Sequence, residues 1–174
     1  MKDNSVIERH IMSVLVDNEP GVLARVIGLF SGRGYNIESL TVSETDPERA
    51  LSRISIVTSG TPMVIEQIKA QLARLVPIHA VRDLTEHDVA IERELALVKI
   101  INHGEERIEA LRIADTFRAR TLDSTLDSFV FEVTGNSSKV DAFVNLMRSL
   151  GSVEVARTGV SAISRGNNIG LEAK

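Results

Sequence analysis

Cysteine is absent from the 174 residues, which excludes disulfides, thiolate metal sites and cysteine nucleophiles. Tryptophan is also absent and aromatic residues make up only 3%, which argues against a surface that stacks the bases of single-stranded nucleic acid. The net charge of -4 argues against the basic face of a nucleic-acid binder. No apolar run reaches the roughly 18 to 20 residues that cross a bilayer, and residues 1–9 lack the apolar core of a signal peptide. We therefore expect a cytoplasmic protein that binds neither membranes nor nucleic acid.

The hydrophobic pattern of the first half predicts strand, helix, strand, strand, helix and strand. Apolar residues are 43% of the chain, and its length suffices for one ordinary domain or two small ones. Pro20 suits the first turn of the first helix, Gly32 and Gly34 end it, and Thr61 with Pro62 opens the second helix. The four predicted strands are 10–16, 35–43, 51–57 and 78–84.

The same order of elements returns in the second half, after a polar linker at 85–88. The predicted strands are 94–101, 120–126, 128–134 and 153–163, and the two helices begin at Glu105 and at a Ser137 or Ser138 cap. Five apolar residues of one half keep the spacing of five in the other, namely Ile65, Ile68, Leu72, Leu75 and Ile78 against Val140, Phe143, Met147, Leu150 and Val153. We therefore predict the α+β class with two tandem ferredoxin-like βαββαβ domains, residues 1–84 and 85–174, the second with a shorter central hairpin. We expect both ends of the chain, residues 1–7 and 166–174, to be loose.

A search for catalytic chemistry yields no candidate. The four histidines are His10, His79, His87 and His103, and their separation in sequence lacks the spacing of a metal site. The short Gly32-Arg-Gly34 segment follows a helix, whereas a dinucleotide-binding loop follows a strand. We expect neither catalytic residues nor a metal site on this chain.

The most distinctive segment is the turn before the first helix, Asp17-Asn-Glu-Pro-Gly-Val-Leu23. The first N–H groups of a helix and its positive dipole end suit a carboxylate, and Gly21 lets a ligand approach the backbone. Asn18 offers both a donor and an acceptor to an amino acid. A second interpretation is that Asp17 or Asn18 caps the helix, as such residues commonly do. The residues of the turn leave both interpretations open.

The run from Ser13 to Val42 closely resembles the ACT domain of acetohydroxyacid synthase small subunits. Its most specific parts are Arg25-Val-Ile-Gly-Leu-Phe30 and Arg33-Gly-Tyr-Asn-Ile-Glu-Ser-Leu40. In the second half, Glu92-Arg-Glu-Leu-Ala-Leu-Val-Lys-Ile100, Lys139-Val-Asp-Ala-Phe143 and Glu154-Val-Ala-Arg-Thr-Gly159 resemble the C-terminal domain of the same family. The resemblance covers nearly the whole chain.

This resemblance implies a regulatory subunit in branched-chain amino-acid biosynthesis. Its partner would be a catalytic large subunit that carries thiamine diphosphate, magnesium and FAD, with no cofactor on this chain. The small subunit would raise the activity and confer feedback inhibition, usually by valine. Two ACT domains would pair side by side as a homodimer with the effector between them. The implied effector pocket has Asn18, Gly21, Val22 and Leu23 from one copy with Asn36 and Ile37 from the other.

Two other functional classes remain to be separated from this one. ACT domains occur in many contexts, so the first domain alone would also fit a free-standing amino-acid sensor with another partner. The second domain favours the synthase subunit, because its resemblance is specific to that family. A small enzyme on a ferredoxin-like scaffold is a third possibility, since the fold hosts many functions, and the lack of candidate catalytic groups counts against it.

Overall fold

The computed structural model describes residues 6–86 and 90–166, which form two compact units. The first unit contains the described residues up to Ile91 together with those from Val160 onward, and the second is Glu92–Gly159. Each unit has its own hydrophobic core on the helix side of a sheet.

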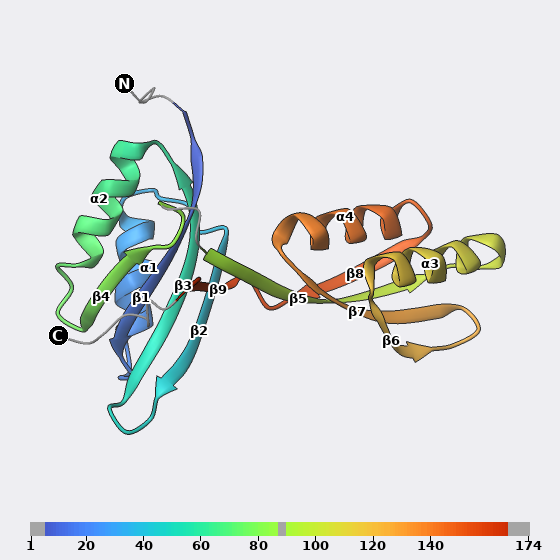
Figure 1. Cartoon of the computed structure of the whole chain (residues 1–174), viewed down its shortest axis with the longest axis horizontal. Coiled ribbons are helices and arrows are strands. Elements are labelled where there is room, and N and C mark those ends of the chain that lie inside the picture. Colours follow the sequence, from blue (N-terminus) through green and yellow to red (C-terminus); the bar gives the residue numbers. More distant parts are fainter. Residues whose placement is uncertain (1–5, 87–89, 167–174) are drawn as a thin grey trace. The chain divides into compact units, whose positions relative to one another are not determined.

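The first unit has the predicted βαββαβ order (Figure 1). Its strands lie in the order β2-β3-β1-β4, and α1 and α2 pack on one face of this sheet. Because every strand is antiparallel to its neighbours, β1 and β2 run in the same direction on either side of β3. The elements are β1 (Glu8–Asp17), α1 (Val22–Gly32), β2 (Ser39–Asp46), β3 (Leu51–Gly60), α2 (Pro62–Leu72) and β4 (Ile78–Asp83).

Alternation along the strands decides which side chains enter the core of this unit. Met12, Val14 and Val16 of β1 lie every second residue and pack under the helices. Val26 and Phe30 come from the facing stripe of α1, at the i, i+4 spacing of one helical face. The predicted start of α2 is confirmed, because the Thr61 side chain accepts a hydrogen bond from the Val64 N–H and Pro62 is the first helical residue.

The second unit repeats the fold with the strand order β6-β7-β5-β8, which confirms the prediction of two ferredoxin-like βαββαβ units. The shorter central hairpin is also confirmed, since β6 and β7 have 5 and 8 residues against 8 and 10 for β2 and β3. Aromatic rings form its core, with the Phe143 ring 5.5 Å from Phe117 and 6.1 Å from Phe131. The elements are β5 (Ala90–Ile101), α3 (Gly104–Phe117), β6 (Arg120–Ser124), β7 (Ser128–Gly135), α4 (Ser137–Arg148) and β8 (Ser152–Arg157).

The last predicted strand, 153–163, is wrong as a single element. β8 ends at Arg157, Gly159 turns the chain with a φ of 84°, and a separate strand β9 (Ser161–Ser164) lies in the first unit. The Val160 N–H donates to Ser39 Oγ at 2.8 Å, and the Val160 carbonyl accepts from Thr41 Oγ1 at 3.0 Å. A second, smaller apolar cluster forms there from Ile11, Val57, Leu84, Val160 and Ala162.

This return of the chain makes the compact units differ from the predicted domains 1–84 and 85–174. The described residues 85, 86, 90 and 91 and those from Val160 onward belong to the first unit. The residues predicted to be loose, 1–7 and 166–174, fall mostly outside the described part of the chain.

Several element starts also differ from the sequence-based expectation, among them those of α1, α4 and β2. Pro20 precedes α1, because Gly21 has a φ of 89° and cannot belong to a right-handed helix. The cap of α4 is Asn136, whose side chain accepts from the Lys139 N–H at 3.0 Å, so the assignment of Ser137 or Ser138 was one or two residues late. β2 begins at Ser39, four residues later than predicted.

Candidate functional site

The turn between β1 and α1 is held by two neighbouring segments of the first unit. The Asp17 N–H donates to the Pro77 carbonyl at 2.9 Å, and the Asn18 N–H donates to the Ala50 carbonyl at 2.7 Å. The Asp17 carboxylate lies 2.6 Å from Nε2 of His79 on β4. The α2–β4 connection and the β2–β3 hairpin therefore fix the backbone immediately before Gly21.

The N-terminus of α1 has no side-chain cap, so the interpretation of Asp17 or Asn18 as its cap is wrong. Gly21 occupies the N-cap position in the left-handed conformation, with φ 89° and ψ −9°. The first helical turn contains no acidic residue that would offset the positive end of the dipole. The Val22 N–H donates to the Glu19 carbonyl at 3.4 Å, whereas helix geometry leaves the next N–H groups of the first turn without intrahelical acceptors, so this end of α1 retains donors for a carboxylate.

Asn18 instead brings a carboxylate to the turn. Its Nδ2 donates to Oε1 of Glu44 at 3.0 Å, and both side chains are exposed. Glu44 lies on β2, and no local feature of the sequence points to its contact with Asn18. The turn therefore combines a positive helix end with a nearby negative side chain, an arrangement that complements the two charges of an amino acid.

Two of the expected pocket residues on this turn differ in their surroundings. The Val22 side chain is buried in the core, where it packs with Val26 and Phe30. Leu23 is 37% exposed. Gly21 is exposed, and a Cβ built on it meets no heavy atom within 4 Å. Open space therefore lies beside the turn, with Leu23 as the exposed aliphatic side chain.

Asn36 and Ile37 lie at the opposite end of the same sheet. The Asn36 carbonyl accepts a hydrogen bond from Thr58 Oγ1 at 2.6 Å, and Thr58 pairs with His10 near the start of β1. Asn18 follows the end of β1, so at about 3.3 Å per strand residue the two groups are roughly 25 Å apart along the sheet. One copy of the chain does not bring the six expected pocket residues together, and a pocket made from all of them needs two copies.

Three histidines that look isolated in sequence each contact an aspartate. His10 Nδ1 lies 2.7 Å from Asp83 Oδ2 in a buried pair, and His103 Nδ1 lies 3.2 Å from Asp127 Oδ1 on the surface. His79 contacts Asp17 as described above, and His87 falls outside the described residues. Within residues 6–86 and 90–166, no group of three or more histidine, aspartate or glutamate side chains could hold a metal ion. These pairs connect separate segments of the fold.

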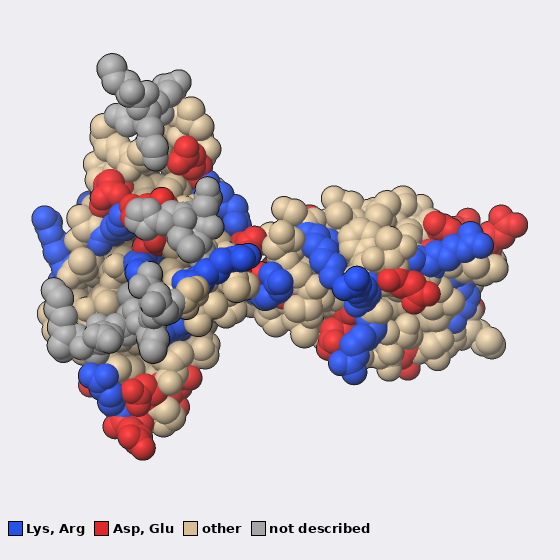
Figure 2. All heavy atoms as spheres, viewed as in Figure 1, with Lys and Arg blue, Asp and Glu red and all other residues tan. Residues whose placement is uncertain are grey.

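Positively and negatively charged side chains lie close together on the surface. On the face shown in Figure 2, lysine and arginine side chains alternate with aspartate and glutamate over each unit. None of the helices in the described part of the chain is long and apolar enough to cross a membrane.

Comparisons with known proteins agree on one family. Residues 12–80 match the family model described as the AHAS small subunit-like ACT domain, and residues 93–166 match the model described as the small subunit of acetolactate synthase. The chain is 49% identical over 159 residues to a probable acetolactate synthase small subunit of Archaeoglobus fulgidus, which covers 91% of this chain and 98% of that protein. It is 48% identical over 162 residues to the acetolactate synthase isozyme 3 small subunit of Escherichia coli, covering 92% and 98%.

A solved structure supports the same assignment over most of the chain. The crystal structure of the acetolactate synthase small subunit from Thermotoga maritima matches with a TM-score of 0.82 and 38% identity, covering 92% of this chain and 99% of that one. This structural match spans the regions of both family models. This chain belongs to the family of acetolactate synthase small subunits.

Proposed function

We propose that this chain is the non-catalytic regulatory subunit of an acetolactate synthase in branched-chain amino-acid biosynthesis. Its partner is the catalytic large subunit, which supplies thiamine diphosphate, magnesium and FAD, and both work in the cytoplasm. The family membership and the uncapped turn at Gly21 support this proposal together. A turn that offers free helix donors beside an acidic side chain suits recognition of a small zwitterion rather than bond breaking.

Valine is the proposed effector, bound at the turn between β1 and α1. Its carboxylate takes the free N–H groups at the start of α1, and its ammonium group is attracted by the Glu44 carboxylate and the Asn18 side-chain oxygen. Leu23 contributes aliphatic surface for the branched side chain. Asn36 and Ile37 complete the pocket from a second copy.

A homodimer follows from this shared pocket, and apolar side chains on the first unit support it. Leu23 and Ile27 of α1 and Val42 of the edge strand β2 are 37%, 41% and 44% exposed. Pairing through this part of the unit would cover both the apolar groups and an open sheet edge. We expect sedimentation equilibrium at micromolar concentration to give the mass of a dimer. A stable monomer under those conditions would contradict the shared pocket.

Reconstitution tests the regulatory role directly. We expect this chain alone to form no acetolactate from pyruvate, the large subunit alone to be weakly active, and the mixture to be several times faster. Valine should inhibit the mixture and leave the large subunit alone unaffected. Substantial turnover by this chain alone would show that it is an enzyme. Valine binding without any effect on the large subunit would favour a free-standing sensor.

A further inference from the structure

Two arginines lie on the face of the first unit's sheet that is opposite to α1 and α2. Arg82 of β4 pairs directly with Ser13 of β1, and Arg53 of β3 pairs with Leu15, the next β1 residue on the same face. Met12 and Val14 point into the core beneath the helices, so the alternation of a strand sends Ser13 and its partner to the other face. β9 belongs to this unit, and its residues Ala162 and Ser164 line the same space.

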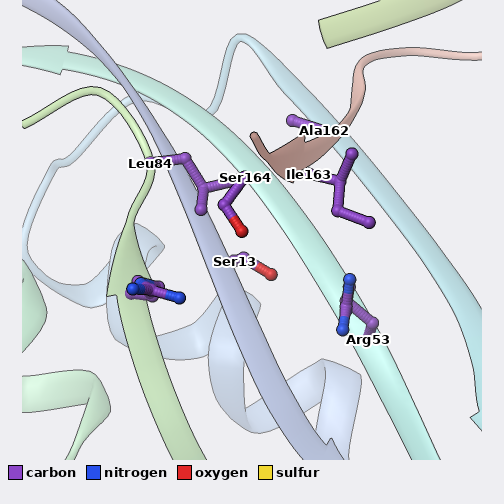
Figure 3. Close-up of a pocket in the computed structure, with 7 residues that line it drawn as sticks. Ser13, Arg53, Leu84, Ala162, Ile163 and Ser164 are labelled. Atoms are coloured by element: carbon purple, nitrogen blue, oxygen red, sulfur yellow. The ribbon is translucent and has the colours of Figure 1, made fainter. Parts of the chain in front are cut away.

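A small cavity lies where these side chains meet (Figure 3). It has about 10 Å³ of room, which is the space that one water-sized group needs. The empty space around it, open solvent included, is about 220 Å³. In Figure 3 the Ser164 hydroxyl points toward Ser13, with Arg53 beyond them. The lining residues are Ser13, Arg53, Arg82, Leu84, Ala162, Ile163 and Ser164.

The charges around this cavity are not balanced within the described residues. Its lining includes two guanidinium groups and no acidic side chain. Arg53 Nε is buried and has no hydrogen-bond acceptor in the described part of the chain. Within residues 6–86 and 90–166, neither Arg53 nor Arg82 forms an ion pair.

Arg157 of the second unit shows one way in which an arginine is neutralised in this protein. Its guanidinium group contacts both Glu94 and Asp141, two carboxylates that neutralise it. A buried guanidinium donor without an acceptor costs free energy, and two cations that line one cavity repel each other. An anion between Arg53 and Arg82 would remove both costs.

We propose that this cavity is a binding site for a carboxylate group. The planar fork of a guanidinium matches the two oxygens of a carboxylate, and Arg53 offers its free Nε donor to one of them. The Ser13 hydroxyl supplies a further donor at the base of the site. The cavity itself admits one carboxylate oxygen, and the open space around it takes the rest of the ligand beside the apolar side chains of Leu84, Ala162 and Ile163. The carboxylate comes either from a small free acid or from an acidic side chain of the catalytic large subunit.

Titration of the full-length chain with acetate tests the site. At constant ionic strength, we expect saturable chemical-shift changes in the first unit's sheet. Arg53→Gln and Arg82→Gln should each weaken acetate binding at least about tenfold, because each removes charged hydrogen bonds. Arg82→Lys keeps the charge and should retain more binding than Arg82→Gln. The matched control is Arg112→Gln on α3, whose side chain is 75% exposed and pairs with Glu109 outside this site, and it should bind like the wild type.

The outcomes show whether the site binds a carboxylate and which of the two sources supplies it. No saturable response, or equal binding by the wild type and both glutamine variants, would overturn the proposal. Circular dichroism checks that each variant folds, and if Arg53→Gln does not, the two Arg82 variants still decide the question. Acetate that weakens association with the large subunit identifies an acidic side chain of the partner as the natural ligand. Association that is independent of acetate identifies a free acid. The turn at Gly21 takes no part in this test. If valine proves not to bind at that turn, the proposal of a carboxylate site at Arg53 and Arg82 is unaffected.

Discussion

Gly21→Asp is expected to abolish inhibition of the reconstituted synthase by valine, whereas Gly21→Asn should only weaken it. The aspartate carboxylate would take the free donors at the start of α1 and would repel the carboxylate of the effector. Two like charges about 4 Å apart in a partly exposed site repel by about 4 kcal/mol, which corresponds to roughly a thousandfold loss of affinity. Asparagine has nearly the same size but no charge, so the difference between the two variants isolates this repulsion.

The structure shows why the asparagine control is needed. Gly21 has a φ of 89°, so any side chain placed there is strained, although the space for a Cβ is open. Asparagine and aspartate are the residues that best tolerate the left-handed region, and the cost is similar for both. The experiment measures the valine concentration that gives half-maximal inhibition, with thermal unfolding of each variant as a check on folding. Wild-type sensitivity in a folded Gly21→Asp variant would show that valine does not bind at this turn.

Phe143→Ala is expected to lower the free energy of unfolding of the second unit by about 3 to 5 kcal/mol. Phe143 is fully buried, and its ring packs between Phe117 of α3 and Phe131 of β7. Its removal leaves a cavity at the junction of both helices with the sheet, and neighbouring rings can fill such a space only in part. The matched control is Leu126→Ala, which removes a side chain that is 89% exposed and should change stability by no more than about 0.5 kcal/mol.

Amide hydrogen exchange is the measurement suited to this variant, because a chain with two cores need not unfold in one step. We expect β5 and β7 to lose protection while β1 and β3 keep theirs. Uniform loss over both units would show that they unfold together. A change below about 1 kcal/mol would contradict the central position of Phe143.

Both βαββαβ units could be predicted from the sequence because their signals are local. Alternation along β1 and the helical spacing of Val26 and Phe30 need no information from elsewhere in the chain. The helix start at Thr61 is likewise a property of neighbouring residues. Ile68 and Phe143 hold equivalent places in the two halves of the sequence, and each is buried in the core of its unit. The same spacing on the same kind of element buries equivalent positions. These features depend on geometry within one element or one turn.

The return of the chain after Gly159 was decided by tertiary structure. Residues 153–163 have the composition of one strand interrupted only by Gly159, and a single glycine in a strand also fits a bulge. The hydrogen bonds that hold Val160 come from Ser39 and Thr41, more than a hundred residues earlier. A local pattern contains no information about such a partner, so the sequence could not show that these residues group with the first compact unit.

The candidate site also combines features that follow from local sequence with features that follow from tertiary structure. Asn18 and Gly21 lie three residues apart in one short turn, so the local sequence is enough to name them as candidates. Glu44 reaches Asn18 only because β2 and β3 pair as a hairpin next to β1, and strand direction places Asn36 at the far end of the sheet. The two unbalanced arginines, Arg53 and Arg82, lie on strands that are both hydrogen-bonded to β1 but far apart in sequence. The sequence was enough to locate the turn, whereas its left-handed backbone at Gly21 was seen only in the structure, and the pairing of distant strands decided which charges surround it.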